Sequence, residues 1–236
     1  CAIGEAGRAE NARIGVTADA APAIGEHIAV ATGADNGYYE GNITSDAGGQ
    51  YGILREGDEV NLYNGLPHKH LLCGTACSHG GEQHTKVLTW TAISDLTKIT
   101  KAGHYCLPQS VTQSSEWQPV DGVVLCLNGY DIICSKDGAN TIKLANGGSF
   151  TLSDCKGTGR ITHADGLTGT GVYLDSAGTF TMYGGSISGN SAAEKGGGVY
   201  MARSTFRMLG GSVSGNSSDE DGAGVYTAGT FNMTGG

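Results

Sequence analysis

A segment near the C-terminal end of the chain is repeated, and this repeat restricts the possible folds more than any other feature of the sequence. Residues 179–191 read Thr-Phe-Thr-Met-Tyr-Gly-Gly-Ser-Ile-Ser-Gly-Asn-Ser, and they recur at 205–217 and begin again at 230–236. The offsets are 206 − 180 = 26 and 231 − 206 = 25 residues. A period of this size is typical of a solenoid, in which each repeat packs mainly against its two neighbours.

Each repeat contains three short strand candidates joined by glycine-rich turns. In Phe180-Thr181-Met182 the apolar and polar residues alternate, which is the pattern of a strand with one buried face. Ile187 supplies the second buried face, and the tripeptide Gly-Val-Tyr, at 171–173, 198–200 and 224–226, supplies the third. Strands this short are not stable as separate hairpins. Wound as one coil and stacked, they would bury a continuous apolar column.

Stacking predicts that equivalent side chains of successive coils lie above one another. The expected structural columns are Phe180, Phe206 and Phe231, Ile187 with Val213, and Asn190 with Asn216. The asparagine pair has two interpretations, a ladder of hydrogen-bonded amides at a turn or a polar ligand site. Repetition in register favours the ladder.

Residues 125–152 fit the same frame with less regular spacing. Because 180 − 125 and 187 − 132 both equal 55, Leu125 and Ile132 are expected in the columns of Phe180 and Ile187, two coils earlier. Residues 149–152 begin the coil between them, and residues 141–144 occupy the Gly-Val-Tyr position. The stretch 154–169 is then predicted to be an insertion rich in polar residues, namely Asp154, Lys156, Arg160, His163 and Asp165.

The repeats resemble those of a known superfamily. Gly-Gly-Ser-Ile-Ser-Gly-Asn, Gly-Gly-Gly-Val-Tyr and Thr-Phe-x-Met-x-Gly-Gly resemble repeats of the pectate-lyase-like right-handed β-helix superfamily, in particular those of large surface proteins of anaerobic bacteria and of polymorphic outer-membrane adhesins. The resemblance covers residues 117–236 and implies an all-β, right-handed parallel β-helix. It implies little about function, because the superfamily includes lyases, glycosidases, phage tailspikes and adhesin stalks.

The domain organisation predicted from the sequence has three parts. Residues 1–66 show no repeat and are expected to form a small irregular β region or arm, with strand candidates at 28–30 and 60–63. Residues 67–119 form a Cys/His-rich loop and an entry or cap module, with strands expected around Tyr105 and Val111 and with Trp117 sealing the first coil. Residues 120–236 form the β-helix, which is expected to be truncated or continued by another subunit.

Potential metal ligands are concentrated at the start of the cap module. They are His68, His70, Cys73, Cys77, His79 and His84. Imidazole and thiolate are preferred zinc ligands, and the spacings His-x-His, Cys-x3-Cys and Cys-x-His let several of them converge on one tetrahedral ion. The hypothesis is a structural zinc that locks the transition into the first coil. The alternative is a disulfide between Cys73 and Cys77 in an exposed loop. No His-Glu-x-x-His motif favours catalytic zinc.

The seven cysteines leave the redox state of the chain open. Cys1 agrees with the first residue of a processed lipoprotein or with the edge of a fragment. The later cysteines could form disulfides, for instance Cys106 with Cys126 and Cys134 with Cys155. Alternatively, Cys126 in Val-Val-Leu-Cys-Leu is a small strand residue.

Charge and hydropathy exclude some functions and favour others. The net charge of 14 − 23 = −9 disfavours nucleic-acid binding, and no apolar run is long enough to span a membrane. The favoured function is a noncatalytic extracellular or cell-surface scaffold or adhesin, with a glycan or host-surface ligand and head-to-tail self-association as possible partners. A carbohydrate-active enzyme is the alternative. The acidic turn residues, Glu194 and Asp219 to Asp221, form a solvated rim or a weak calcium site.

Overall fold

The computed structural model describes residues 14–16, 27–30, 43–45, 51–56, 59–64, 68–74, 84–145 and 147–236. The chain divides into two compact units, Cys1–His68 and Lys69–Gly236. In the first unit, β1 (Ile14–Val16) pairs in parallel with β3 (Ile43–Ser45). A separate antiparallel sheet contains β2 (His27–Val30), β5 (Glu59–Asn64) and β4 (Tyr51–Glu56). Strands β2 and β5 include both strand candidates of the N-terminal region.

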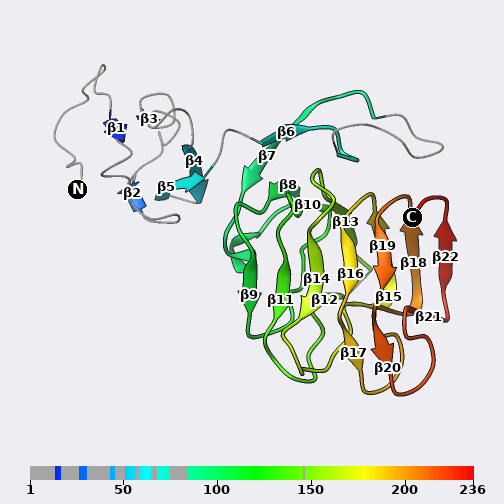
Figure 1. The fold of residues 1–236 in the computed structure, drawn as a ribbon. Helices are drawn as coiled ribbons and strands as arrows, with labels where there is room; N and C mark the ends of the chain where they lie inside the picture. Colours follow the sequence, from blue (N-terminus) through cyan, green and yellow to red (C-terminus); the bar gives the residue numbers. More distant parts are fainter. Residues whose placement is uncertain are drawn as a thin grey trace. The chain divides into compact units, whose positions relative to one another are not determined.

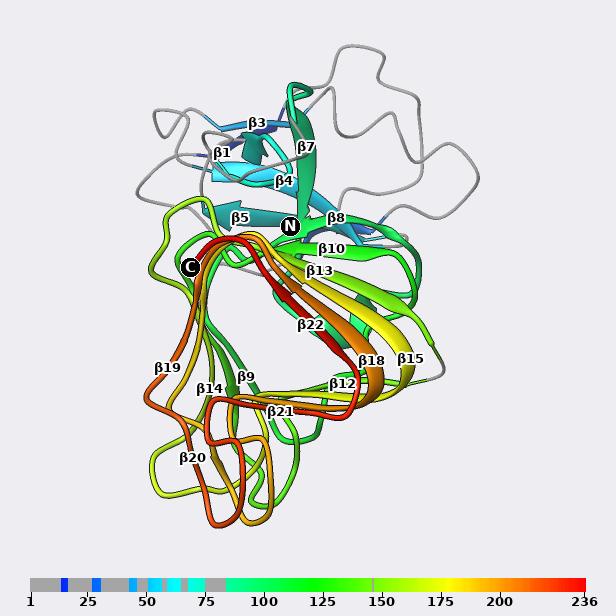
Figure 2. The same cartoon turned by 90° about the vertical axis from the view of Figure 1, so that its right-hand side faces the viewer.

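The second unit is a parallel β-helix of about four turns, wound in the right-handed sense (Figures 1 and 2). Its larger sheet contains β6 (His68–His70), β7 (Leu88–Ala92), β8 (Gly103–Cys106), β10 (Val123–Cys126), β12 (Ile142–Leu144), β13 (Ser149–Ser153), β15 (Val172–Met182), β18 (Val199–Met208), β21 (Val225–Thr227) and β22 (Thr230–Met233). The second sheet contains β9 (Val111–Gln113), β11 (Ile132–Cys134), β14 (Arg160–His163), β16 (Ser186–Ser188) and β19 (Ser212–Ser214). A short pair is formed by β17 (Ser191–Ala192) and β20 (Ser217–Ser218). The predicted fold class is confirmed.

Phenylalanine rings form the most regular column of the core. Phe150, Phe180, Phe206 and Phe231 follow one another in register on β13, β15, β18 and β22. Their ring centroids are 5.7, 4.9 and 5.1 Å apart, and each pair is stacked nearly parallel. Phe180 and Phe206 are fully buried, whereas Phe231 on the last coil is 36% exposed. Stacked coils therefore exclude water from the column, as the repeat predicts.

A second apolar column runs along the smaller sheet and extends the repeat into the degenerate coils. Ile132, Ile161, Ile187 and Val213 are register partners on successive strands. The three isoleucines are fully buried. The predicted equivalence of Ile132 and Ile187 therefore holds, with Ile161 occupying the coil between them.

The register on the larger sheet differs from the prediction by two residues. Val123 pairs with Phe150, which pairs with Phe180, so that Leu125 lies in the column of Met182 rather than in that of Phe180. The turn length is the cause. From Val123 to Ile132 the chain advances 132 − 123 = 9 residues, against 187 − 180 = 7 in the regular coil. A turn that faces solvent can change its length while the strands on each side remain stacked.

The predicted insertion at 154–169 is also wrong in part. Residues 160–163 form strand β14, which pairs with β11 and β16 and places Ile161 in the core. The additional residues lie in the turn before this strand. Arg160 and His163, which were expected in an inserted loop, are therefore part of a regular coil.

The coil stack includes residues upstream of 120. Strands β8 and β9 lie in register below β10 and β11, and β7 pairs with β8. A 3-10 helix, η2 (Leu96–Lys98), connects β7 to β8. Trp117 is buried and lies edge-on to Phe150, with ring centroids 5.5 Å apart. Within the described residues, no helix has the length and apolar character required to cross a bilayer.

Candidate metal centre

Two of the predicted zinc ligands lie on β6, a strand of the larger sheet of the β-helix. His68 and His70 are separated by one residue, and side chains at positions i and i+2 of a strand point to the same side. The division between the two units of the chain falls inside this strand. His70 is buried, and its ring stacks on the indole of Trp90 with centroids 4.3 Å apart.

Two cysteines that the sequence analysis did not assign to this site complete the group. Cys126 is the last residue of β10, and Cys155 lies two positions after the end of β13. On β10, Val123 and Leu125 are core residues, so the alternation of the strand directs Cys126 to the outer face of the coil. An outward residue of a solenoid is ordinarily exposed to solvent. Cys126 is instead fully buried, as is its register partner Cys106, at 0% and 2% exposure.

The donor atoms of the four side chains converge. His68, His70, Cys126 and Cys155 each offer one ligand atom, and all four atoms lie within 4.8 Å of one another. In the part of the chain that the structure describes, this is the group of His, Cys, Asp and Glu side chains that could hold a metal ion. Two imidazole nitrogens and two thiol sulfurs are the donor set of structural zinc sites. The arrangement could therefore bind a metal ion such as zinc.

Hydrogen bonds position the ligands of this group. The backbone N–H of Asn128 donates to Cys126 Sγ over 3.3 Å, and Cys155 Sγ donates to Asn128 Oδ1 over 3.7 Å. Asn128 has a positive φ of 52°, a left-handed conformation that Asn tolerates better than most residues. Nδ1 of His70 contacts the carbonyl oxygen of Leu71. A donating Nδ1–H leaves the lone pair on Nε2.

The thiols of Cys126 and Cys106 have pKa values above the ordinary range of cysteine. The pKa of Cys126 is raised above its ordinary value, first by a hydrogen bond with Cys155 and then by burial. Burial, with a smaller contribution from Cys155, raises the pKa of Cys106 to about 12. A thiolate needs either water or a positive charge to stabilise it, and a bound metal ion would supply that charge.

The other predicted ligands are Cys73, His84, Cys77 and His79. Cys73 and His84 are described by the structure but lie outside the group, and the His84 ring contacts Tyr183 edge-on at 5.1 Å. Cys77 and His79 lie outside the described residues. The suggested disulfides of Cys106 with Cys126 and of Cys134 with Cys155 are not formed, because Cys106, Cys126 and Cys134 are free thiols.

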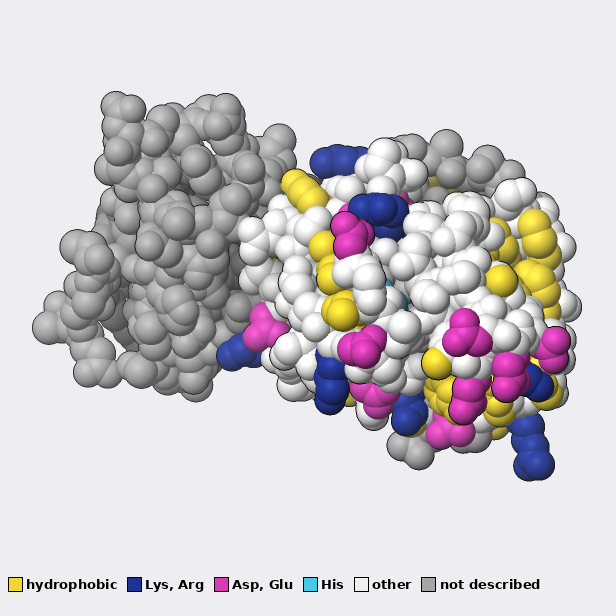
Figure 3. Space-filling model, turned by 60° about the horizontal axis from the view of Figure 1, so that its bottom comes forward, with side chains coloured by type: hydrophobic (Ala, Val, Ile, Leu, Met, Phe, Trp, Pro, Cys, Tyr) yellow, Lys and Arg dark blue, Asp and Glu magenta, His cyan; other side chains and the backbone are white. Residues whose placement is uncertain are grey.

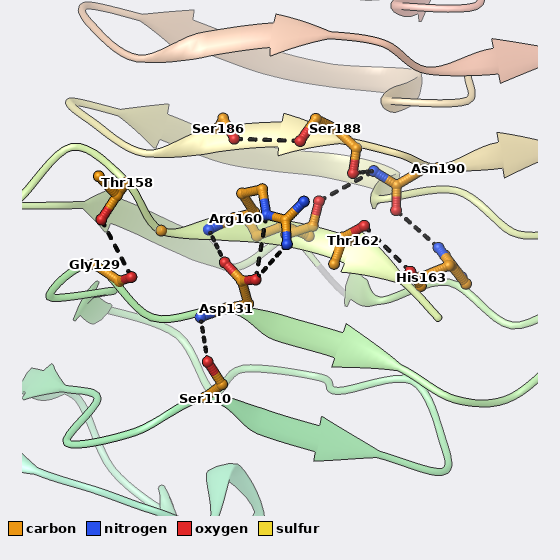
Figure 4. Close-up of polar contacts among 12 residues, drawn as sticks. Ser110, Gly129, Asp131, Thr158, Arg160, Thr162, His163, Ser186, Ser188 and Asn190 are labelled. Carbon is orange, nitrogen blue, oxygen red and sulfur yellow. Dashed lines mark hydrogen bonds and ion pairs between the residues drawn. The ribbon is translucent and has the colours of Figure 1, made fainter. Parts of the chain in front are cut away.

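The asparagine ladder forms and continues into a histidine of the preceding coil. Asn190 Nδ2 donates to Asn216 Oδ1 over 2.9 Å and to the carbonyl oxygen of Ile161 over 3.1 Å. Asn190 Oδ1 lies 2.8 Å from His163 Nδ1, and His163 Nε2 lies 2.8 Å from the carbonyl oxygen of Ala139. Figure 4 shows His163 and Asn190 pointing toward each other from successive coils. Asn190 and His163 are 1% and 5% exposed, so this part of the network stabilises the turns and is closed to a ligand from solvent.

The polar residues on the outer face of the smaller sheet also pair between coils. Arg160 donates through Nη2 and Nε to Asp131 Oδ2 over 2.7 and 3.2 Å, and the backbone N–H of Arg160 donates to Asp131 Oδ1 over 2.9 Å (Figure 4). The hydrogen bond and charge of Asp131 raise the pKa of Arg160. This guanidinium therefore joins β14 to the turn before β11.

The acidic turn residues are partly neutralised by a lysine. Lys195 Nζ lies 3.8 Å from Glu220 Oε2 and 3.6 Å from Asp221 Oδ2. On the face that Figure 3 shows, acidic and basic side chains of the β-helix lie among one another. Calcium binding at this rim stays a prediction.

The fold places this chain in the class of parallel β-helix proteins, with a His2Cys2 group on the outer face of the first coils. No protein-family model, curated protein or solved structure matches the chain.

Proposed function

We propose that this chain is a noncatalytic β-helix scaffold or adhesin of the extracellular space or of a bacterial cell surface. The main observation behind the proposal is that carboxylates on the outer face accept hydrogen bonds within the protein. In a polysaccharide lyase or hydrolase on this fold, acids of neighbouring coils would face a substrate groove. Here four aspartates at the turns accept hydrogen bonds from the adjacent coil.

Four aspartates follow this pattern, and each accepts at least one backbone N–H. Asp121 Oδ1 accepts from the N–H and hydroxyl of Ser149 over 2.8 and 2.7 Å. Asp137 Oδ1 accepts from the N–H and hydroxyl of Thr168, both over 2.8 Å. Asp131 binds Arg160 as described above, and Asp154 Oδ1 accepts from the N–H of Gly129 over 2.7 Å. The partners are one coil away, so these side chains stabilise the stack.

On the regular coils, the outward positions between the Phe and Met columns carry no acids. Thr181, Arg207 and Asn232 are register partners that lie between the Phe and Met columns on β15, β18 and β22. None of the three can act as a general acid or carboxylate nucleophile at neutral pH. These three outward positions of the larger sheet therefore offer no paired carboxylates.

The outer tyrosines also support a structural role. Tyr173, Tyr200 and Tyr226 stack in register with centroids 4.7 and 5.3 Å apart and interplanar angles of 4° and 18°. Lys195 Nζ lies over the Tyr226 ring, 4.8 Å from its centroid. A sugar that binds an aromatic platform needs an uncovered ring face, whereas these faces largely contact one another. A glycan ligand, if bound here, would contact ring edges and hydroxyl groups.

Polysaccharide turnover distinguishes the scaffold from the enzyme. The purified chain would be incubated with acidic and neutral polysaccharides, with and without calcium, and new reducing ends and unsaturated products would be measured. We expect no turnover of any substrate. Turnover that is lost in Asp131→Asn and retained in Asp121→Asn would establish the carbohydrate-active enzyme instead. Cleavage of the chain by protease added to intact source cells would test the surface location.

End-to-end association is a further part of this proposal. On the last described coil, Phe231 and Met233 are 36% and 56% exposed, whereas their partners Phe206 and Met208 are buried. A strand of a second copy that pairs with the outer edge of β22 would cover these side chains. Light scattering should then show oligomers that Phe231→Asp dissociates. A monomer at high concentration would exclude this association.

A further inference from the structure

We propose that His68, His70, Cys126 and Cys155 bind a single structural zinc ion that fastens strand β6 to two successive coils of the β-helix. The proposal does not depend on the scaffold function. It differs from the site that the sequence suggests, because two of the four ligands come from the coils themselves. It assigns a role to cysteines that the repeat leaves unexplained.

The distances suit zinc after a small adjustment. Zn–S bonds of about 2.3 Å and Zn–N bonds of about 2.0–2.1 Å place the ligand atoms of a tetrahedral site about 3.3 to 3.8 Å apart. The four donor atoms lie within 4.8 Å of one another. Side-chain rotations that move the donor atoms by about 1 Å would therefore bring all four within bonding distance of one zinc ion. His68 and Cys155 are only half-buried, which leaves them room for this movement.

The donor chemistry selects the metal and its role. Two sulfurs and two imidazole nitrogens favour zinc over calcium and magnesium, which prefer oxygen ligands. Four protein ligands fill a tetrahedral shell, so that no position remains for water or substrate. The site therefore stabilises structure and does not perform hydrolysis.

The surroundings of the ligands are those of a supported metal site. Metal-bound histidines commonly donate their second ring N–H to a carbonyl oxygen, and His70 Nδ1 contacts the Leu71 carbonyl in this manner. The Asn128 N–H that points at Cys126 Sγ would stabilise a thiolate. The stacking of His70 on Trp90 fixes the ring plane.

The site explains why an outward face of the solenoid is buried. Cys106, Cys126 and Ser153 are register partners that alternation directs outward, yet their exposure is 2%, 0% and 0%. A Cβ atom added to Gly74 would lie 3.8 Å from Cys155 Cα, so the segment after β6 passes close to this face. Small thiols and a hydroxyl offer little apolar area to hold such a segment. A metal bond between β6 and the coils would supply the missing free energy.

Zinc stoichiometry and affinity test the proposal in the full chain. The protein would be loaded with zinc under reducing conditions, dialysed and analysed by mass spectrometry of the metal. We expect equimolar zinc, and a loss of affinity of more than about 100-fold for His68→Ala and for Cys155→Ser, because even outer-sphere substitutions cost about 10- to 100-fold. Cys134→Ser is the matched control, since Cys134 is a buried thiol outside the group, and it should keep its zinc.

Alkylation identifies the ligands without relying on a variant that might fail to fold. Zinc should protect the half-buried Cys155 of the wild-type chain from alkylation, relative to the chelator-treated protein, and leave the reactivity of Cys73 unchanged. Absence of bound zinc in the fully reduced protein would overturn the proposal. Protection of Cys73 in place of Cys155 would overturn the ligand set. A disulfide between Cys126 and Cys155 in protein from its native source would also overturn it, because that bond removes both thiolates.

Discussion

Replacing one aromatic ring on each face of β18 separates the contribution of burial from that of ring stacking. Phe206 and Tyr200 belong to the same strand, and each ring is stacked between two others. Phe206 is fully buried in the core, whereas Tyr200 lies half-buried on the outer face. The two alanine variants therefore remove equal numbers of ring contacts from environments that differ mainly in their exposure to water.

The expected losses of stability differ by a factor of about two. Phe206→Ala removes a buried ring and leaves a cavity between Phe180 and Phe231, which should lower the free energy of unfolding by about 3–5 kcal/mol. Tyr200→Ala removes two stacked pairs of about 0.5–1.5 kcal/mol each, which gives about 1–3 kcal/mol. Water can fill the space that Tyr200 leaves, so the second variant loses little additional free energy of unfolding through cavity formation.

Guanidinium unfolding followed by tryptophan fluorescence measures both losses. The chain contains two tryptophans, Trp90 and Trp117, and both lie in the unit that forms the β-helix, so the signal reports on this unit alone. Circular dichroism of both variants before unfolding controls for a changed fold. If Tyr200→Ala cost as much free energy as Phe206→Ala, stacking of rings rather than burial would hold the coils together, and the explanation of the repeat would be refuted.

Three further predictions concern the contacts between coils. The hydrogen bonds from Ser149 lower the pKa of Asp121, so this carboxylate stabilises the fold above its unfolded pKa, near 3.8, and the stabilisation is lost as the pH falls through the lower folded pKa. Asp121→Asn should therefore weaken the loss of stability on acidification. An unchanged pH profile of the melting temperature would contradict this prediction. Asn190→Ala should lower the free energy of unfolding by about 1–3 kcal/mol in chemical denaturation, because buried groups on both sides lose a partner; a neutral effect would show that the ladder does not contribute. Gly197→Ala would place a Cβ 2.0 Å from the carbonyl oxygen of Ser217 on the next coil and should prevent stacking. The control is Gly138→Ala, whose Cβ would meet no atom within 4 Å and which should cost only the strain of its positive φ. Equal melting temperatures of the two variants would exclude this steric explanation.

Much of the fold was predictable because the repeat encodes it locally. In the regular coils the offset between equivalent Phe residues is 26 and then 25 residues, so a nearly constant spacing in sequence becomes a fixed position in space. The parallel pairing of Phe180 with Phe206, and the asparagine ladder, follow from this property alone. The prediction was wrong for the column of Leu125 and for the insertion at 154–169, where turns of variable length break the link between spacing and register.

The metal group shows a different limit of sequence reasoning. His68 and His70 are close in sequence, and the local concentration of His and Cys predicts both as ligands. The same concentration also predicts Cys73 and His84, which belong to the same segment. Proximity along the chain does not determine which side chains meet when a segment crosses a stack of coils. The useful signal in the sequence was the cysteine in the outward position of Val-Val-Leu-Cys-Leu, a position that usually carries a polar residue exposed to solvent.

The sequence by itself determined that the chain winds into stacked parallel coils with Phe, Ile and Val columns inside, because identical side chains at a constant interval can all be buried only by stacking. The tertiary structure decided which outward residues are covered and by what. It alone brought Cys126 and Cys155 to the histidines of β6, because these contacts join segments of the chain with no common period. Periodic features can be predicted from the sequence, whereas a site formed by unrelated segments exists only after the chain has folded.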